Sequence, residues 1–562
     1  MSDTDGGDGA NTAAPTKATA PEEPTEPTQP SGSAWSPLRV RIFRELWLAQ
    51  FASNVGSWMQ TVGAQWLLVS HGAGQVALVQ VAAGLPVLFL ALPAGVLADL
   101  VDRRRLLLIM QGAMALVATV LAGLSFAGLL GSWSLLGLTF LLGCGGALNG
   151  PAWQAVQPSL VPRDQLRQAS ALGAVNQNLA RAIGPALGGA LVAFLGVSWT
   201  FAVNAVSFLG ILIVLALWRP SGESRTPRPG QEREHMLAAL RAGGRYVRRA
   251  PRVRRILLRS ALFVPSAAAL WALLPVTAQK SLGLGAAGYG LLLGAVGLGA
   301  VGGATALPLV SRRIGGNGAL ALAGTVFAGA LLDLAWVPSV PAAWIALMLA
   351  GAAWIIGLST LNAGLQLALP TWVRARAVAF YLLVFQGGMA LGSLVWGQVA
   401  QHTSVTLAMA LAGALLLVGV VSLRWLRLLD GRVDPTLSEA WPEPRLLVEP
   451  APQDGPVLVT AVYRVRPERV PDFAQAMRRV ENSRRRTGAV TWGLYRDAAS
   501  EDRFVEAFTV SSWSEHCAQH HGRYTGMDHT FETRARELLE EDPVVTHAVM
   551  VEPDTAGVTR MR

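Results

Sequence analysis

Twelve long apolar segments constrain this 562-residue chain more than any other feature of its sequence. As a helix, about 20 such residues span the roughly 30 Å hydrocarbon core of a bilayer. The segments must be helical, because lipid offers no partner for unpaired backbone groups. The chain is 52% hydrophobic and only 15% charged, against about 25% charged in soluble proteins. We therefore predict an all-α polytopic membrane protein with twelve transmembrane helices, near residues 46–70, 77–98, 106–127, 134–155, 170–195, 198–218, 260–279, 286–310, 317–337, 341–367, 377–400 and 405–427.

Positive residues distinguish the two ends of these segments. With the N-terminus inside, the inside loops hold most of the arginines, including twelve between Arg219 and Arg259. The six outside loops hold one positive residue, Lys280. Because positive loops stay in the cytoplasm, we expect both termini to be cytoplasmic in a bacterial inner membrane. The net charge of +10 then reflects topology, and we expect no nucleic-acid partner.

Composition divides the membrane part. Residues 1–37 are rich in Pro, Thr, Glu, Gly and Ser, which predicts a disordered tail without a cleavable signal peptide. The basic loop 219–259 separates two six-helix halves, 38–218 and 260–427. Its stretch RRAPRVRRILLRS is basic and amphipathic, which suits the surface of an anionic bilayer. Two six-helix halves indicate a duplicated architecture with a substrate site between them.

The character of the sequence changes after the last segment. Residues 428–455 are rich in Pro and acidic residues and predict a linker. Residues 456–562 alternate between strand-like and helical periodicities, which predicts a cytoplasmic α+β domain. Cys144 lies in the membrane part and Cys517 in this domain, so we expect no disulfide.

The loop after the second segment reads GVLADLVDRRR and begins at Gly95. The carboxylate of Asp99 and the guanidinium groups of Arg103 and Arg104 can form a charge network there. This loop resembles the signature of the major facilitator superfamily, which implies a conformational latch between the two halves on the cytoplasmic side. Arginines that only set topology are the alternative. In the second half Pro308 occupies the position of Asp99, so we expect no second latch.

The fifth segment contains the sequence Gly184-Pro185-Ala-Leu-Gly188-Gly189. Gly184 and Gly188 lie one helical turn apart, which allows a partner helix to approach closely. Pro185 removes a backbone donor and can bend the helix. The sequence resembles the G-P-x-x-G-G element of exporters in the superfamily, which implies outward transport. Ordinary packing of small residues is the alternative.

Several polar side chains lie inside the predicted helices. Arg181 is charged deep in the fifth segment and shares a face with Gln177, so it should face a cavity or a partner. It can bind an anionic substrate group, couple protons indirectly, or have a structural role. The other candidates for the substrate path are Asn54, Trp58 and Gln65 in the first segment, Asn362 and Gln366 in the tenth, and Tyr381 and Gln386 in the eleventh. Proton coupling is expected, but Glu45, Asp333, His71 and His402 all lie towards segment ends.

Four stretches narrow the resemblance: SNVGSWMQTVGAQWLL, PAGVLADLVDRRRLLL, PSLVPRDQLRQASAL and LNAGLQLALPTWVRARAVAFY. They are similar to the branch of the superfamily that contains enterobactin exporters and transmembrane secretion effectors. The resemblance implies efflux of siderophores, antibiotics or similar amphipathic molecules, driven by the proton motive force. The chain has no G-x-x-x-x-G-K-S/T loop, which argues against an ATP-driven pump.

The C-terminal stretches GPVLVTAVYRV, RRRTGAVTWGLYRD and VEAFTVSSWSEHCAQHHGRYTGMD also carry a resemblance. They are similar to the ferredoxin-like dimeric α+β barrels of antibiotic-biosynthesis monooxygenases, which implies dimerisation through this domain. Trp513, His516, His520 and His521 suggest haem or metal binding, but no neighbouring Cys, Asp or Glu completes a ligand set. We therefore expect no catalytic residues, metal or cofactor.

Three other functions are compatible with these patterns. The chain can import its substrate, flip a lipid-like substrate, or combine transport with catalysis by a monooxygenase-like domain.

Overall fold

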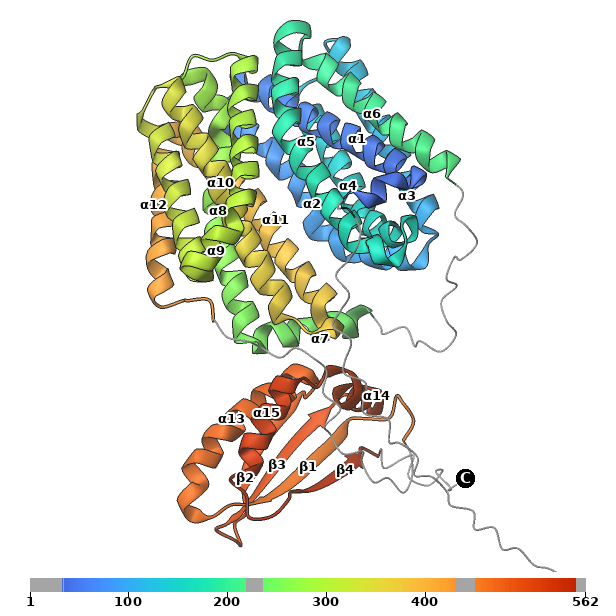
Figure 1. The fold of residues 1–562 in the computed structure, drawn as a ribbon, viewed down its shortest axis with the longest axis vertical. Coiled ribbons are helices and arrows are strands. Elements are labelled where there is room, and N and C mark those ends of the chain that lie inside the picture. The colour runs from blue at the N-terminus through green and yellow to red at the C-terminus, as the bar shows by residue number, and fades with distance from the viewer. Residues whose placement is uncertain (1–32, 34, 219–235, 430–449, 552–562) are drawn as a thin grey trace, which may run out of the picture.

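The computed structural model describes residues 33, 35–218, 236–429 and 450–551. Most of the predicted tail, 1–37, and residues 430–449 of the predicted linker, 428–455, lie outside the described residues. Two helical bundles stand side by side, and a smaller α+β domain lies against one end of the second bundle (Figure 1). We call this end of the membrane helices the proximal end and the opposite end the distal end.

The first bundle contains six long helices, which account for the predicted half 38–218. They are α1 (Arg41–Leu68), α2 (Ala73–Leu100), α3 (Arg103–Phe126), α4 (Ser132–Leu160), α5 (Leu166–Leu195) and α6 (Val197–Leu217). Two polar side chains fix helix ends at the proximal side. Asp102 accepts a hydrogen bond from the backbone N–H of Arg105 at 2.8 Å and so caps α3. Arg104 donates to the carbonyls of Leu215 and Ala216 at the end of α6.

The second bundle begins earlier than predicted. Its helices are α7 (Met236–Arg249), α8 (Pro251–Lys280), α9 (Ala286–Trp336), α10 (Val340–Ala368), α11 (Thr371–His402) and α12 (Val405–Val421). Helix α7 and the start of α8 occupy the second part of the predicted loop 219–259. The guanidinium of Arg259 is buried and donates to the carbonyls of Gly419, in the last turn of α12, and Leu426, after that helix. The basic stretch therefore also packs against the bundle.

Ten of the described helices are long and apolar enough to span a bilayer: α2 to α6 and α8 to α12. Helix α1 is absent from this group because its uncharged part, from Leu46 to Leu68, contains several Asn, Gln, Ser and Gly residues that lower its hydropathy. Helix α9 has 51 residues and includes two of the predicted segments. They meet at Gly315, whose φ of +64° favours glycine over any residue with a Cβ.

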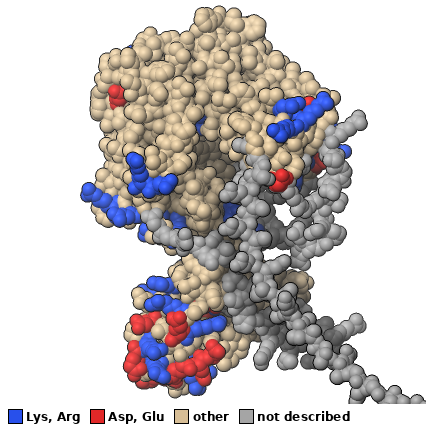
Figure 2. Space-filling model, in the orientation of Figure 1, with Lys and Arg blue, Asp and Glu red and all other residues tan. Residues whose placement is uncertain are grey.

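The exposed surface of these helices is apolar. Phe194, Leu217 and Trp133 are each more than 75% exposed, a pattern that suits contact with lipid rather than water. On the face drawn in Figure 2 most charged side chains lie on the α+β domain, towards the adjoining end of the second bundle and on one side of the first bundle, while most of the remaining surface of the bundles carries none. Arg312 and Arg313 at the proximal part of α9 are both exposed.

The two bundles meet at their distal ends. Helix α5 crosses α9, and α2 crosses α11. The backbone N–H of Gly74 in α2 donates a hydrogen bond to the side-chain amide oxygen of Gln401 in α11, at 3.2 Å. Ala77 of α2 lies so close to Gly397 that a Cβ on that glycine would be 2.3 Å from the Cβ of Ala77. Close packing of small residues thus joins the halves.

The C-terminal domain contains one antiparallel sheet with strand order β2-β3-β1-β4. Its elements are β1 (Val457–Arg464), α13 (Val470–Thr487), β2 (Thr491–Arg496), β3 (Arg503–Val510), α14 (Trp513–Ala518), a π-helical turn (Gln519–Arg523), α15 (Gly526–Arg536) and β4 (Val544–Val549). This β-α-β-β-α-β order is that of the split βαβ motif. Helices α13 and α15 cover one face of the sheet (Figure 1).

Candidate substrate pathway

A cleft of about 310 Å³ lies at the proximal end of the first bundle, between α1, α4 and α5. The described residues that line it include no charged side chain and combine amides with aromatic rings. Gln154 and Gln177 are exposed, so the cleft opens to solvent. The lining residues are Phe43, Leu46, Trp47, Gln50, Asn54, Trp153, Gln154, Gln157, Leu160, Ser170, Gly173, Ala174, Asn176 and Gln177.

A chain of hydrogen bonds fixes the amides on one wall of this cleft. Gln50 donates to Asn54 at 3.0 Å, and Asn54 donates to Asn176 at 2.8 Å. Asn176 in turn donates to the carbonyl of Trp47 at 2.8 Å, so α1 and α5 are held in register. The amide oxygen of Gln50 is buried and has no hydrogen-bond partner among the described residues. A ligand donor in the cleft can satisfy it.

Arg181 lies one helical turn above Gln177 on α5. Its guanidinium carbon is 5.6 Å from the centroid of the Trp58 ring, a cation–π arrangement between α5 and α1. Among the described residues Arg181 forms no ion pair, and its buried Nε atom has no hydrogen-bond partner. The structure therefore brings three predicted path residues, Trp58, Gln177 and Arg181, to one side of α5, next to Asn54.

Gln65 has a different position from the rest of the predicted stripe on α1. It is 1% exposed and contacts the second bundle. The hydroxyl of Tyr289 donates to its amide oxygen at 2.5 Å, and its amide nitrogen donates to the carbonyl of Trp271 at 3.1 Å. Gln65 thus helps to close the distal end between the bundles.

The glycines of the α5 motif contact two different helices. A Cβ on Gly184 would lie 2.6 Å from the Cβ of Trp58, and a Cβ on Gly188 would lie 2.8 Å from the Cα of Met59. The absence of a side chain at both positions therefore allows α1 to pack closely against α5. A Cβ on Gly189 would lie 2.7 Å from the Cα of Gly290 in α9. The carbonyl of Pro185 also lies against Gly290. The motif therefore occupies the junction of α1, α5 and α9, where the two bundles cross.

The predicted latch is only partly described. The surroundings of Gly95 and the side chain of Asp99 are not described by the structure. Arg103 is exposed and takes part in a further interaction, while Arg104 caps α6. The role of these residues as a latch stays a prediction.

The predicted path residues of the second bundle do not line the cleft. Asn362 and Gln366 are exposed and share a weak hydrogen bond of 3.4 Å. Tyr381 is buried and stacks on Phe385 with ring centroids 6.5 Å apart. Gln386 is half-buried. Their roles in a substrate path stay predictions.

Sequence reasoning missed most of the amides of the cleft. Two signals were present: Gln154 and Gln157 lie three residues apart on α4, and Gln50 and Asn54 lie four apart on α1, so each pair shares a helix face. Asn176 and Asn54 are hydrogen-bonded but lie 122 residues apart in the sequence, so no local sequence pattern could predict their contact.

Charged residues connect the C-terminal domain to the second bundle. Arg523 donates to both carboxylate oxygens of Glu515 at 2.7 Å and lies 5.1 Å from the ring centroid of Trp372 in α11. Arg245 of α7 approaches Glu515 at 3.5 Å. Burial opposes ionisation of Glu515, but the hydrogen bonds and charge of Arg523, with the charges of Arg245 and Arg376, hold its pKa below the usual value. We call this group of contacts the docking contact.

The core of the C-terminal domain contains a buried ion-pair network. Arg484 of α13 lies between Glu506 of β3 and Glu532 of α15. The hydroxyl of Tyr463 and the indole of Trp492 donate to Glu506 at 2.6 and 2.7 Å. Burial and the charge of Glu506 raise the pKa of Tyr463 well above 10, so the phenol stays a donor. The network borders a small cavity of about 30 Å³ between helices and sheet.

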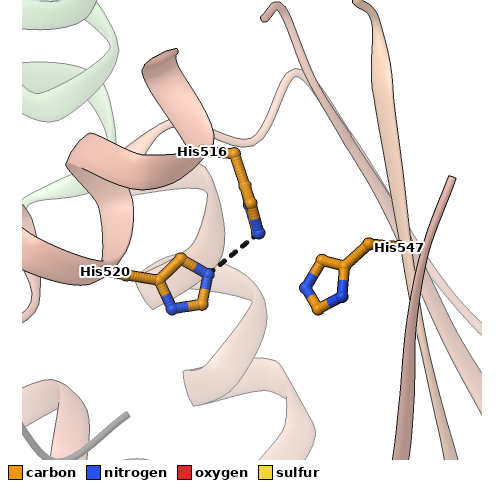
Figure 3. A group of neighbouring side chains, drawn as sticks. All are labelled: His516, His520 and His547. Carbon is orange, nitrogen blue, oxygen red and sulfur yellow. Dashed lines mark hydrogen bonds between the residues drawn. The ribbon is translucent and has the colours of Figure 1, made fainter. Parts of the chain in front are cut away.

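Three histidines converge beside this cavity (Figure 3). The predicted pair His516 and His520 share a helix face, and the Nε2 atoms of the two rings are 3.0 Å apart. The third, His547, comes from β4 and was not singled out in the sequence. The side chain of His521 lies outside the described residues. Burial, the charge of His547 and that of Arg484 lower the pKa of His516 to about 4, and burial lowers that of His547.

Comparison with known proteins assigns the family of the chain. A family model described as "Transmembrane secretion effector" matches residues 32–555. The enterobactin exporter EntS of Escherichia coli O1:K1 is 31% identical over 393 residues, which cover 68% of this chain and 91% of the relative. The enterobactin exporter EntS of Shigella boydii serotype 18 is 33% identical over 233 residues, which cover 40% of this chain and 54% of that relative.

The membrane part also has a known fold. The crystal structure of the nucleoside transporter NupG covers 69% of this chain and 99% of its own, with a TM-score of 0.53 at 14% identity. A likeness at this identity concerns the fold, and it agrees with the predicted resemblance to the major facilitator superfamily. The family match extends beyond the membrane helices and over the α+β domain. The chain therefore belongs to the transmembrane secretion effector family.

Proposed function

We propose that the chain is a secondary exporter of small amphipathic molecules of the siderophore or antibiotic class, driven by the proton motive force and working by alternating access. The ten apolar helices, α1 and the second part of α9 would together form twelve transmembrane helices. Both termini, and the C-terminal domain, would be cytoplasmic, because the arginine-rich loops lie at the proximal end.

One observation carries this proposal: the cleft between α1, α4 and α5 opens at the proximal end, while the distal end is closed. Gly189 and Gly290, Gln65 and Tyr289, and Gly74 and Gln401 close the distal end. If the proximal end is cytoplasmic, this is the inward-facing state of a transporter. An exporter loads its substrate in that state.

The chemistry of the cleft supports an amphipathic substrate. Amides supply uncharged donors and acceptors, and Trp47 and Trp153 supply apolar faces for aromatic groups. Arg181 supplies a positive charge, with Nε available, for an anionic group of the substrate. The relatives named as enterobactin exporters support a substrate of siderophore type.

Susceptibility profiling tests this function. A strain that lacks the gene should become more sensitive to at least one member of a panel of antibiotics and siderophores, and the intact gene should restore resistance. A panel with no change in sensitivity, under conditions in which the intact protein is produced, would count against efflux.

Arg181 provides the sharper test. Loss of a charge-assisted hydrogen bond costs about 1.5–3 kcal/mol, so Arg181→Gln should raise the KM for an anionic substrate by roughly 10- to 100-fold. Arg181→Lys should restore part of the affinity. Arg313→Gln, at an exposed site on α9, is the matched control and should leave the KM unchanged. An unchanged KM in Arg181→Gln would remove Arg181 from the substrate site without affecting the assignment of the fold.

A further inference from the structure

We propose that His516, His520 and His547 form a binding site for a divalent transition-metal ion, of which Zn²⁺ is the best match. This site goes beyond transport and lies in the C-terminal domain. The three side chains each offer a ligand nitrogen, and the three nitrogens all lie within 4.8 Å of one another. Figure 3 shows the rings of His516 and His520 meeting on one side and that of His547 approaching from the strand opposite.

The distances suit a tetrahedral ion. Zinc binds imidazole nitrogen at about 2.0–2.1 Å, so two ligands of one ion lie roughly 3.3 Å apart. The Nε2 atoms of His516 and His520 are already 3.0 Å apart. His547 is held by the pairing of β4 with β1, where it faces Val459, and a small rotation of its side chain brings it into range. The site thus joins two elements that are distant in sequence.

The surroundings favour a ligand role over a purely structural one. The Nε2 atom of His547 is buried and has no hydrogen-bond partner among the described residues. Such an orphaned polar atom is rare in native folds and calls for a partner, such as an ion. Burial keeps these imidazoles neutral, which is the form that binds metal. Imidazole nitrogens as the full ligand set suit Zn²⁺, Cu²⁺ or Ni²⁺.

Three histidines leave the fourth position of a tetrahedral ion to another ligand. Trp513 closes one side, with its ring centroid 5.2 Å from that of His516 and 6.4 Å from that of His547. On the other side Val459 and Val545, which lie beside His547 in the sheet, line a cavity of about 30 Å³. Three histidine ligands with one further position resemble catalytic rather than closed structural zinc sites. The cavity has room for a water molecule, which can take this position.

The site also lies next to the docking contact. His516 follows Glu515 directly on α14, and Glu515 pairs with Arg523 and approaches Arg245 of α7. A bound ion would fix α14 to β4 and so hold Glu515 in place. Metal binding should therefore stabilise the docking of the domain on the second bundle.

Metal titration of the full-length protein in detergent tests the site. After treatment with a chelator and removal of the chelate, Co²⁺ should bind at one equivalent per chain and give the visible absorption of a tetrahedral ion. Zn²⁺ should displace it, because zinc binds nitrogen ligands more tightly than cobalt. A chain that binds no Co²⁺, or an octahedral spectrum typical of oxygen ligands, would overturn the proposal.

Variants assign the ligands. His547→Ala and His516→Ala should each weaken Co²⁺ binding by more than about 100-fold, because loss of a second-shell partner alone costs roughly 10- to 100-fold. His529→Ala, an exposed histidine of α15, is the matched control and should bind as the parent does. If His547→Ala unfolds the domain, His547→Asn keeps a polar side chain of similar size and should still lose the ion. Binding that stays unchanged in a folded His547 variant would overturn the site.

Discussion

Buried charge is handled differently in the two parts of the molecule. In the C-terminal domain Arg484 is enclosed by Glu506 and Glu532, with Tyr463 and Trp492 completing the hydrogen bonds of Glu506. In the membrane part Arg181 has the ring of Trp58 beside it and, among the described residues, no carboxylate. The ion pairs of Arg484 are complete, so this network can stabilise the fold of the domain. Arg181 keeps a donor atom available, so it can bind an anionic ligand.

This difference predicts the effect of removing Glu506. Glu506→Gln leaves Arg484 with one carboxylate in a buried site, which should destabilise the domain by about 3–5 kcal/mol. Glu541→Gln is the control: Glu541 pairs with Arg464 at 3.2 Å, but both side chains are more than half exposed. Loss of such a surface pair costs about 0–1 kcal/mol. Hydrogen exchange of the β1 and β3 amides in the full-length protein measures both, and equal losses would contradict the role of the network.

At the scale of elements, the crossing of α5 and α9 determines how closely the two bundles approach. Gly189 and Gly290 lie in contact there. On the other side of α5, Gly188 allows α1 to pack closely against the helix. The same short motif thus packs helices within the first bundle and between bundles. That arrangement places the predicted exporter motif at a contact which must open if the transporter faces outward.

A single methyl group tests this crossing. In Gly189→Ala the new Cβ would lie 2.6 Å from the carbonyl oxygen of Ala286, so the distal ends should separate and the outward-facing state should gain population. Spin labels at Ser70→Cys and Ser281→Cys, exposed on the two distal ends, should then show a longer distance. Cys144 and Cys517 are replaced by Ser in all variants.

The control is Gly210→Ala on α6, where a Cβ meets nothing within 4 Å. Its label distance should match that of the parent. If Gly189→Ala also gives the parental distance, the crossing is not the contact that limits opening.

The docking contact permits a second prediction about elements. Trp372→Ala removes the ring that lies against both Arg523 and Tyr246, whose ring centroid is 5.6 Å from that of Trp372. The amides of α7 should then exchange faster, because the domain leaves that helix more often. Trp425→Ala, at a tryptophan that is 72% exposed, should leave exchange in α7 unchanged. Equal exchange in both variants would mean that Trp372 does not hold the domain.

At the scale of the whole molecule, patterns along the chain predicted more than contacts across it. Apolar length predicted most membrane helices, and period-two alternation in residues 457–465 predicted β1. The kinked helix α9 appeared as two segments, because polar residues near Gly315 interrupt its apolar run. Helix α7 was assigned to a loop because its residues are strongly basic.

The two sites show the same limit. The cleft depends on the contact of Asn54 with Asn176, and the histidine cluster depends on β4 lying beside β1. His516 and His520 share a helix face that the sequence indicates, but their third partner comes from a different strand. Tertiary packing alone brings such residues together.

The central claim is that this molecule moves substrate out of the cytoplasm, and transport by energised membrane vesicles tests it most directly. Inside-out vesicles, which would expose the proximal end to the medium if that end is cytoplasmic, should accumulate a substrate found by susceptibility profiling when a proton gradient is applied. The accumulation should stop when a protonophore is added and should be reduced by Arg181→Gln. Accumulation by right-side-out vesicles alone would contradict the account, because it would make the protein an importer.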